Sequence, residues 1–237
     1  MIKKIKLLIE KNQRLANIMR YIYRQTIFKY KQYKNNRNFR QNATYVMEHL
    51  NKVFNELGVK YWLVYGTLLG VYRDGKFIEH DDDIDIGLFL DDYSENIKKV
   101  MNKYGFKLKR EILIDNGDYG REETYELKGI DIDLFYFIKK EDYFLAHDFK
   151  NEDGKSWAKT IQDNGGLIVR ERRFTPFSLK EIEFLNKKFY IPYPTKEHLA
   201  SVYGDDFMIP NPSWNPYNEP KNIKILKNKI GKVISYE

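Results

Sequence analysis

Residues 81–86 read DDDIDI, and this alternation of acidic and apolar residues constrains the fold more than any other segment. Successive side chains of a β-strand point to opposite faces, so Asp81, Asp83 and Asp85 share one face, while the isoleucines and Leu88 face a core. Carboxylates two residues apart on a strand lie ~6–7 Å from each other and repel. A fold tolerates this if some carboxylates are protonated or if a cation lies between them, and a hard divalent ion is the simpler solution. The segment therefore predicts a site for Mg²⁺ (or Mn²⁺).

The segment before the aspartates completes a cradle around them. Residues 61–65 form an apolar and aromatic run that predicts a buried strand, and Gly66 and Thr67 end it. Backbone N–H groups and a hydroxyl at such a turn can bind phosphate, which favours phosphoryl-type transfer. The alternative is a solvated acidic loop or a structural calcium site, although the spacing lacks the central Gly and distal Glu of an EF-hand loop.

A longer ordered set of residues surrounds the aspartates. It comprises Gly66-Thr67-Leu68-Leu69-Gly70, Arg73, Phe77-Ile78 and Asp81-Asp82-Asp83-Ile84-Asp85-Ile86. This set resembles the LicD family, which includes bacterial phosphocholine transferases and the fukutin-related proteins and belongs to the nucleotidyltransferase-fold superfamily. The resemblance extends over residues 45–212, with a further match at Tyr203-Gly204-Asp205. The chain departs from the family at Glu79-His80, where many members carry Pro-Trp beside the donor pocket.

The resemblance implies a metal site built from carboxylates. Asp83 and Asp85 would hold the ion against a diphosphate, and Asp81 would be an outer ligand. A third carboxylate would come from a later apolar strand, in which Asp131 and Asp133 share one face. Asp133 is preferred because the residues that follow it resemble the family's Asp-Ile-Phe pattern, and Asp131 is the rival. Asp133 would ligate the metal or act as general base on the acceptor hydroxyl.

The resemblance also implies residues that bind the substrate. Gly66, Thr67 and Arg73 would position phosphate oxygens, and His80 would contribute to the donor pocket. Guanidinium groups bind phosphate in a bidentate manner, but Arg73 has a plainer interpretation as an ion pair with Asp74.

The activity implied by the resemblance is transfer of a phospho-alcohol, with phosphocholine from CDP-choline as the first choice. The acceptor would be a hydroxyl of a cell-surface glycan or glycolipid, such as a capsule or lipopolysaccharide, and CMP would be released. One alternative is a polyol-phosphate transferase that uses CDP-ribitol or CDP-glycerol. Others are a glycosyltransferase with a DxD motif and a non-catalytic glycan-binding protein.

The basic residues of the chain are concentrated at its start. Residues 1–40 contain twelve Lys or Arg and one acidic residue. The remaining residues hold 29 basic and 33 acidic side chains, so the net charge of +7 comes from the start of the chain. Apolar residues recur at helical spacing over 2–33, which predicts a basic amphipathic helix that contacts an anionic membrane or docks on the domain. The absence of Cys excludes disulfides and thiolate nucleophiles. With no signal-peptide pattern, we expect a cytoplasmic protein, peripheral on the inner face of the plasma membrane, that binds no nucleic acid.

The apolar periodicity predicts an α/β (α+β) fold, and the resemblance specifies it as a nucleotidyltransferase-like mixed β-sheet flanked by helices. We expect a helical arm at 1–40, a catalytic domain at 41–220 and a Lys-rich tail at 221–237. The predicted helices are 42–57, 93–103 and 196–203, the last with Thr195 as N-cap, and the predicted strands are 106–114, 124–127, 130–138 and a hairpin at 179–191.

Residues 140–176 are the least defined part of the sequence. Trp157 and the Gly165-Gly166 turn indicate a lid on the acceptor side or an ordinary surface excursion. Arg170, Arg172 and Arg173 predict an edge strand with a charged face, with binding of a phosphate or an anionic glycan as the alternative.

Overall fold

The computed structural model describes residues 29–211, 214 and 222–236 together with Ile18 and Tyr21. The chain folds into a mixture of helices and strands, as expected. The strands are β1 (Trp62–Leu63), β2 (Asp83–Phe89), β3 (Lys107–Ile114), β4 (Gly120–Leu127), β5 (Ile130–Lys139), β6 (Phe144–Lys150), β7 (Leu167–Phe174), β8 (Ser178–Phe184), β9 (Lys187–Tyr193) and β10 (Ile223–Ser235). The helices are α3 (Lys29–Leu57), α4 (Tyr65–Asp74), α5 (Glu95–Lys103), α6 (Trp157–Asn164) and α7 (Thr195–Tyr203), with 3₁₀ turns η2 (Leu90–Asp92) and η3 (Asp115–Gly117).

The helix predicted over 2–33 lies mostly outside the described residues, so the N-terminal arm and its membrane contact stay predictions. Within the described part of the chain, no helix is both long enough and apolar enough to cross a bilayer.

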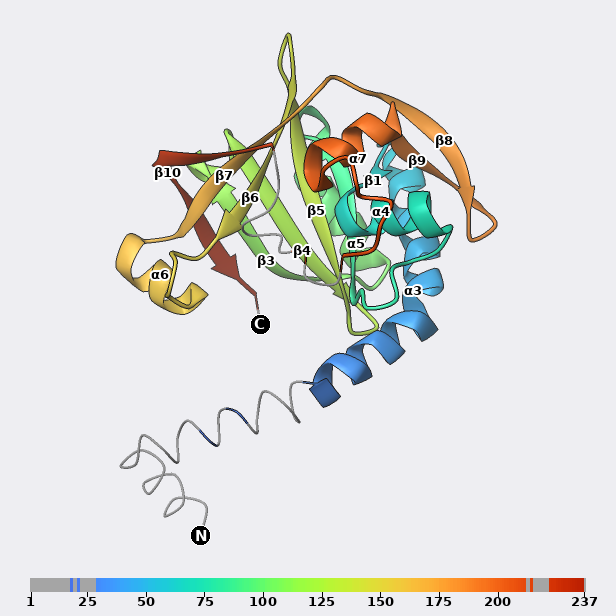
Figure 1. Cartoon of the computed structure of the whole chain (residues 1–237), viewed down its shortest axis with the longest axis horizontal. Coiled ribbons are helices and arrows are strands. Elements are labelled where there is room, and N and C mark those ends of the chain that lie inside the picture. Colours follow the sequence, from blue (N-terminus) through green and yellow to red (C-terminus); the bar gives the residue numbers. More distant parts are fainter. Residues whose placement is uncertain (1–17, 19–20, 22–28, 212–213, 215–221, 237) are drawn as a thin grey trace.

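All ten described strands belong to one sheet in the order β4-β3-β10-β7-β6-β5-β2-β1-β9-β8. Strand β4 pairs with β5 as well as with β3, so the strands from β3 to β7 close into a ring with β10. Strand β2 adds to this ring by pairing in parallel with β5, and β1, β9 and β8 continue the sheet beyond it. Figure 1 shows α4 and α7 together over the β1 and β9 end.

Helix α3 begins at Lys29 and is longer than the predicted helix 42–57. Its sequence contains no Pro or Gly, so nothing stops the helix before residue 42. The apolar stripe of its C-terminal half, which includes Val46 and Leu50, is fully buried in the core. Its N-terminal start projects from the body of the domain (Figure 1).

Residues 140–176, which the sequence left undefined, form two strands and a helix. Strand β7 is an interior strand between β10 and β6, so the prediction of an edge strand is wrong. Arg170 and Arg172 are buried, and both pair with Asp148 on β6. Arg173 keeps an exposed side chain and pairs with Glu171 at 2.6 Å.

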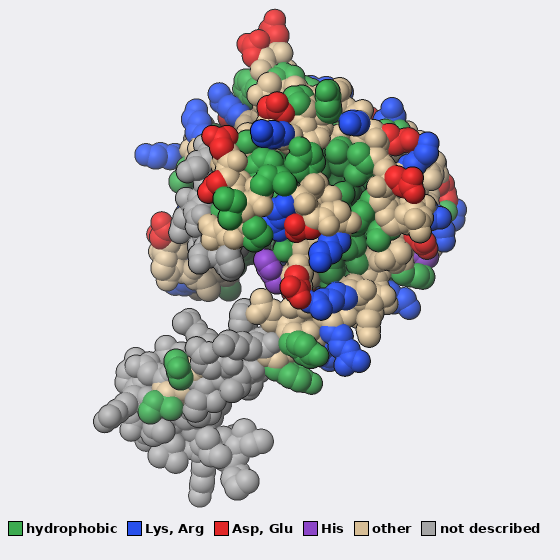
Figure 2. Space-filling view, turned by 45° about the vertical axis from the view of Figure 1, so that its right-hand side comes forward, with side chains coloured by type: hydrophobic (Ala, Val, Ile, Leu, Met, Phe, Trp, Pro, Cys, Tyr) green, Lys and Arg blue, Asp and Glu red, His purple; other side chains and the backbone are tan. Residues whose placement is uncertain are grey.

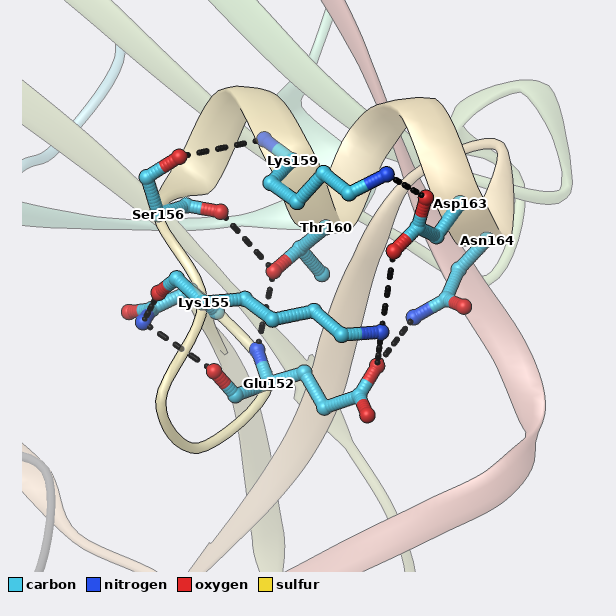
Figure 3. Close-up of polar contacts among 8 residues, drawn as sticks. Glu152, Lys155, Ser156, Lys159, Thr160, Asp163 and Asn164 are labelled. Atoms are coloured by element: carbon cyan, nitrogen blue, oxygen red, sulfur yellow. Dashed lines mark hydrogen bonds and ion pairs between the residues drawn. The ribbon is translucent and has the colours of Figure 1, made fainter.

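Helix α6 is fixed by a set of short-range polar contacts (Figure 3). The Ser156 hydroxyl caps the helix by accepting the Lys159 N–H, and the Thr160 hydroxyl accepts the Glu152 N–H. Lys155 bridges Glu152 at 2.8 Å and Asp163 at 3.0 Å. Trp157 at the start of this helix lies under the guanidinium of Arg110, 5.2 Å from it, which connects α6 to the site described below. Its role as a lid stays a prediction.

Two further segments differ from the sequence-based expectation. Residues 223–235, assigned to the C-terminal tail, form β10, in which Gly231 lets the backbone pass close to the ring of Phe149. Helix α7 begins at Thr195 itself, with Pro194 at the N-cap position and no side-chain cap. The Thr195 hydroxyl instead donates to the Pro192 carbonyl at 2.6 Å, so the predicted N-cap is wrong by one residue.

Candidate functional site

Three of the predicted aspartates come together through the parallel pairing of β2 with β5. The register places Asp83 opposite Asp131 and Asp85 opposite Asp133. One carboxylate oxygen from each of Asp83, Asp85 and Asp133 lies within 4.8 Å of the other two. We call these three residues the aspartate cluster. Alternation on β2 leaves its isoleucines and Leu88 fully buried on the opposite face, as the sequence predicts.

The surroundings of the two candidates for the third carboxylate distinguish them. Asp131 is bound by the Lys109 ammonium at 2.6 and 2.8 Å, so its charge is already compensated. Asp133 accepts a hydrogen bond from the Thr124 hydroxyl and lies 3.7 Å from the Arg110 guanidinium. Of these two residues only Asp133 belongs to the aspartate cluster, and its role as the third metal ligand stays a prediction.

Gly66 and Thr67, which we assigned to phosphate binding, both contact Asp85, and their contact with phosphate stays a prediction. The Gly66 N–H donates to Asp85 Oδ2 at 3.1 Å, and the Thr67 hydroxyl accepts the Asp85 N–H at 2.9 Å. Both residues lie in the first turn of α4, whose free N–H groups favour a negative charge. This pair of hydrogen bonds fixes the backbone and the carboxylate of Asp85 together.

Thr67→Val removes the acceptor for the Asp85 N–H while preserving the shape of the side chain. Thr67 is 1% exposed, so the lost hydrogen bond leaves a buried donor unpaired. We expect a loss of about 1–3 kcal/mol in the free energy of unfolding, measured by chemical denaturation. Thr67→Ser keeps the hydroxyl and is the matched control. Equal stability of the valine and serine variants would contradict this role.

Asp81 lies just before β2, on a loop that α3 supports. The Asn36 side chain donates to the carbonyls of His80 at 2.8 Å and Asp81 at 3.0 Å. Oxygen Oδ2 of Asp81 is buried and has no hydrogen-bond partner among the described residues. Asp81 is therefore held beside the aspartate cluster but is not one of its three members.

Burial raises the pKa of every carboxyl group in the aspartate cluster, and the charges of nearby carboxylates add to this effect. Burial is the larger cause for Asp83, whose pKa rises to about 7 with further contributions from Asp133 and Asp81. Burial and the charges of Asp83 and Asp133 also raise the pKa of Asp85 well above its usual range. Burial raises the pKa of Asp133, although Arg110 and the Thr124 hydroxyl oppose the shift. Three converging carboxylates of this kind fit a hard divalent cation, which would replace the protons.

A cleft of about 870 Å³ adjoins this site. The residues that line it include Gly66, Arg73, His80, Asp81, Tyr203 and Trp214. A second cavity, of about 790 Å³, is lined by Lys60 and Tyr190, and none of the described residues that line it forms a hydrogen bond or ion pair with the aspartate cluster. The first cavity is lined by Gly66, whose N–H binds Asp85, so it is the candidate substrate cleft. In the space-filling view, apolar side chains occupy the middle of the face shown and charged side chains surround them (Figure 2).

Arg73 and His80 both line the substrate cleft, but Arg73 is already paired. Its guanidinium binds the Asp74 carboxylate through Nε at 3.1 Å and Nη2 at 2.9 Å, which is the plainer of the two interpretations from the sequence. The charges of His80 and Arg73 lower the pKa of Asp81, although burial outweighs them and raises it to about 6. Their contact with phosphate stays a prediction.

Sequence reasoning missed the residues that approach the aspartate cluster from elsewhere in the sheet. Thr124 and Arg110 are brought beside Asp133 by β4 and β3, and Asn36 reaches the loop of Asp81 from α3. None of them stands in a local motif. For Thr124 and Arg110 the signal was a polar residue on a strand, which identifies a partner only once the register is known, and Asn36 on the helix carried no such signal.

The fold and the aspartate cluster are those of an α/β protein with a candidate metal site, and the sequence of the chain matches a known family. The chain belongs to the LicD/FKTN/FKRP, nucleotidyltransferase domain family, whose sequence pattern matches residues 58–194, and the resemblance found in the sequence is thereby confirmed. The chain is 29% identical over 192 residues to the ribitol-5-phosphate transferase FKTN of Homo sapiens, a match that covers 78% of this chain and 37% of that protein.

Two further relatives support the same assignment. The ribitol 5-phosphate transferase FKRP of Homo sapiens is 31% identical over 123 residues, covering 47% of this chain and 23% of that protein. An uncharacterized protein of Rickettsia typhi is 26% identical over 178 residues, covering 73% of this chain and 46% of that protein. The matched region spans less than half the length of each of these relatives.

Proposed function

We propose that this protein transfers a polyol phosphate, with ribitol 5-phosphate as the first candidate, from a CDP-linked donor to a hydroxyl of a glycan or glycolipid. The observation that carries the proposal is the aspartate cluster beside a cleft of about 870 Å³. Membership of the family supports a phospho-alcohol transferase. Two of the named relatives are ribitol-phosphate transferases, and their names favour a polyol phosphate over phosphocholine. We also propose that the sheet has the nucleotidyltransferase-like arrangement named in the family description.

The proposed reaction is a displacement at phosphorus. The acceptor hydroxyl oxygen bonds to the phosphorus that carries the alcohol, and the bond from that phosphorus to the bridging oxygen of CMP breaks. The products are a phosphodiester on the acceptor, CMP and one proton. Asp133 is the candidate general base. The Thr124 hydroxyl and the Arg110 guanidinium beside it favour the ionised carboxylate, which is the form that accepts a proton.

A divalent cation would be held by Asp83, Asp85 and Asp133, and it would neutralise the negative charge of the donor diphosphate. Gly66 and Thr67 keep Asp85 in place for this purpose. We propose Mg²⁺ or Mn²⁺, because both ions prefer oxygen ligands. Asp81 would stand next to the cation as an outer group.

Binding and turnover of several donors test the proposal directly. Purified protein is incubated with Mg²⁺ and CDP-ribitol, CDP-glycerol, CDP-choline or a UDP-sugar, and binding is measured by calorimetry with and without a chelator. Metal-dependent binding of CDP-ribitol and release of CMP in the presence of a glycan acceptor are expected. Preference for a UDP-sugar would replace the proposal with a glycosyltransferase, and binding of glycan without donor would indicate a glycan-binding protein.

Phosphocholine remains the second candidate for one structural reason. The substrate cleft brings Tyr203, Phe207 and Trp214 together with Asp81 and Asp206. Aromatic faces near carboxylates can recognise a quaternary ammonium group. Preference for CDP-choline in the donor comparison would therefore select this alternative.

The metal affinity of the site is expected to increase with pH. The pKa of Asp83 is about 7 and that of Asp81 about 6, so protons compete with the metal below neutral pH. Each displaced proton weakens binding about tenfold per pH unit below the pKa of its group. Titration of Mn²⁺ at pH 6, 7 and 8 is expected to give the weakest binding at pH 6. Equal affinity at all three values would contradict a site formed by these carboxylates.

A further inference from the structure

A pair of arginines shares one carboxylate close to the aspartate cluster. Nitrogen Nε of Arg170 binds one oxygen of Asp148, while Nε and Nη2 of Arg172 bind the other. The arginine side chains are 4% and 6% exposed, and that of Asp148 is 11% exposed. The same carboxylate therefore holds both guanidinium groups in place.

Two hydrogen-bond donors at this position have no partner among the described residues. One is nitrogen Nη1 of Arg172, and the other is the hydroxyl of Tyr65, both of them buried. The Arg172 guanidinium carbon lies 5.2 Å from the centroid of the Tyr65 ring, so the two groups are neighbours. Buried polar groups are almost always hydrogen-bonded, and a pair of unpaired donors side by side indicates a missing acceptor.

The chain connects these donors directly to the aspartate cluster. Tyr65 immediately precedes Gly66, whose N–H binds the Asp85 carboxylate. The backbone of Tyr65 has φ of +43°, in the left-handed region that non-glycine residues seldom adopt. Such strain is retained mainly where function requires it.

Tyr203 connects the same donors to the substrate cleft, which it lines. Burial raises the pKa of its hydroxyl, and the nearby charge of Asp85 adds to this while Arg172 opposes it. Arg172 and Asp85 therefore act on one side chain from within the same site.

We propose that Arg172 and Tyr65 bind a phosphate oxygen of the donor diphosphate beside the aspartate cluster. This inference rests on the proposed function, because it supplies a binding group for the substrate of the same site. A guanidinium and a hydroxyl together offer charge-assisted donors on the side of the phosphate that the cation does not cover. Arg172 belongs to the arginine-rich segment for which the sequence left phosphate binding as an alternative to an edge strand.

Three variants separate phosphate binding from structural support. Tyr65→Phe removes only a hydroxyl that has no hydrogen bond to the described part of the chain, and it keeps the ring against Phe135. Arg172→Lys keeps the positive charge near Asp148 and loses the guanidinium. Arg170→Lys is the matched control, because it makes the same exchange on the same carboxylate. Inorganic pyrophosphate with Mn²⁺ is the probe, its affinity is measured by calorimetry, and Mn²⁺ alone and thermal unfolding are measured in parallel.

We expect Arg172→Lys to weaken pyrophosphate binding about tenfold, as the loss of a charge-assisted hydrogen bond predicts, and Tyr65→Phe to weaken it about threefold. Arg170→Lys is expected to change it by less than twofold, and the affinity for Mn²⁺ alone is expected to stay constant in all three. Losses no larger in Arg172→Lys than in Arg170→Lys, or no binding of pyrophosphate by the wild type, would overturn the inference. If the wild type turns over no CDP-linked donor while the expected losses are found, the proposed function fails and the phosphate site stands.

Discussion

Replacing Asp85 with Asn is expected to abolish transfer and, at the same time, to stabilise the metal-free protein. The variant lacks one of the three carboxylate charges that would hold the cation. A bound cation stabilises the transition state by several kcal/mol, so its loss is expected to lower the rate by about 10³-fold or more. Asparagine can still accept the Gly66 N–H through its carbonyl oxygen. The loss of activity should therefore come with an intact fold.

The stability gain follows from the sign of the pKa shift. Burial and the charges of Asp83 and Asp133 raise the pKa of Asp85, so the folded chain holds this proton more tightly than the unfolded chain. Ionisation above the unfolded pKa of about 4 then destabilises the fold. Asn cannot ionise, so its advantage in melting temperature should be absent near pH 4 and increase toward pH 8.

Asp131→Asn is the matched control for this prediction. Asp131 lies on β5 next to the aspartate cluster in the register, but its carboxylate is bound by Lys109 at the surface. We expect this variant to retain most of the activity and to gain no stability, since an exposed ion pair contributes little. Turnover by the Asp85 variant close to that of the wild type, or equal losses in the two variants, would contradict the assigned role of the aspartate cluster.

Gly70→Ala is expected to destabilise the fold, although alanine is normally the better residue in a helix. A Cβ atom at this position would lie 2.7 Å from the carbonyl oxygen of Lys76 and 2.8 Å from the backbone nitrogen of Ile78. These are backbone atoms that cannot move independently, so the loop that leads to Asp81 must shift. Overpacking of this kind costs about 1–3 kcal/mol in the free energy of unfolding, which chemical denaturation measures.

The sign of this effect distinguishes it from the ordinary exchange of glycine for alanine in a helix. Where space is available, alanine stabilises a helix by about 0.5–1 kcal/mol relative to glycine. Destabilisation therefore requires the close approach of the loop to Gly70. A stable Gly70→Ala variant with wild-type metal affinity would show that the loop can be displaced without consequence for the site.

The local part of the site could be predicted from the sequence because its signals lie within one short segment. Alternation over 81–86 defines a strand with its acidic and apolar faces, and this is the arrangement of β2. The second acidic alternation, on an apolar strand, left Asp131 and Asp133 as candidates, and the family resemblance implied Asp133 as the partner of Asp85. Parallel pairing of β2 with β5 brings these two residues together. The alternation itself depends on the period of a single strand.

The rest could not be predicted because it depends on which strands become neighbours. Arg172 stands in a segment that is typical of an exposed edge, and only the position of β7 between β6 and β10 buries it. Similarly, the hydrogen bond of the Thr67 hydroxyl with the Asp85 N–H joins α4 to β2, and no local motif marks this contact. Long-range pairing of this kind leaves no period in the sequence.

Strand β10 imposes an order on the biosynthesis of the domain. It lies between β3 and β7, and Lys232 pairs with Leu113, which leaves the ribosome far earlier. Until residues 223–235 have been synthesised, the facing edges of β3 and β7 lack their partner, and unpaired edges are prone to association with other chains. The ring that carries Asp133 therefore closes only at a late stage of synthesis. Shortening the chain by these residues would open two strand edges rather than remove a dispensable extension.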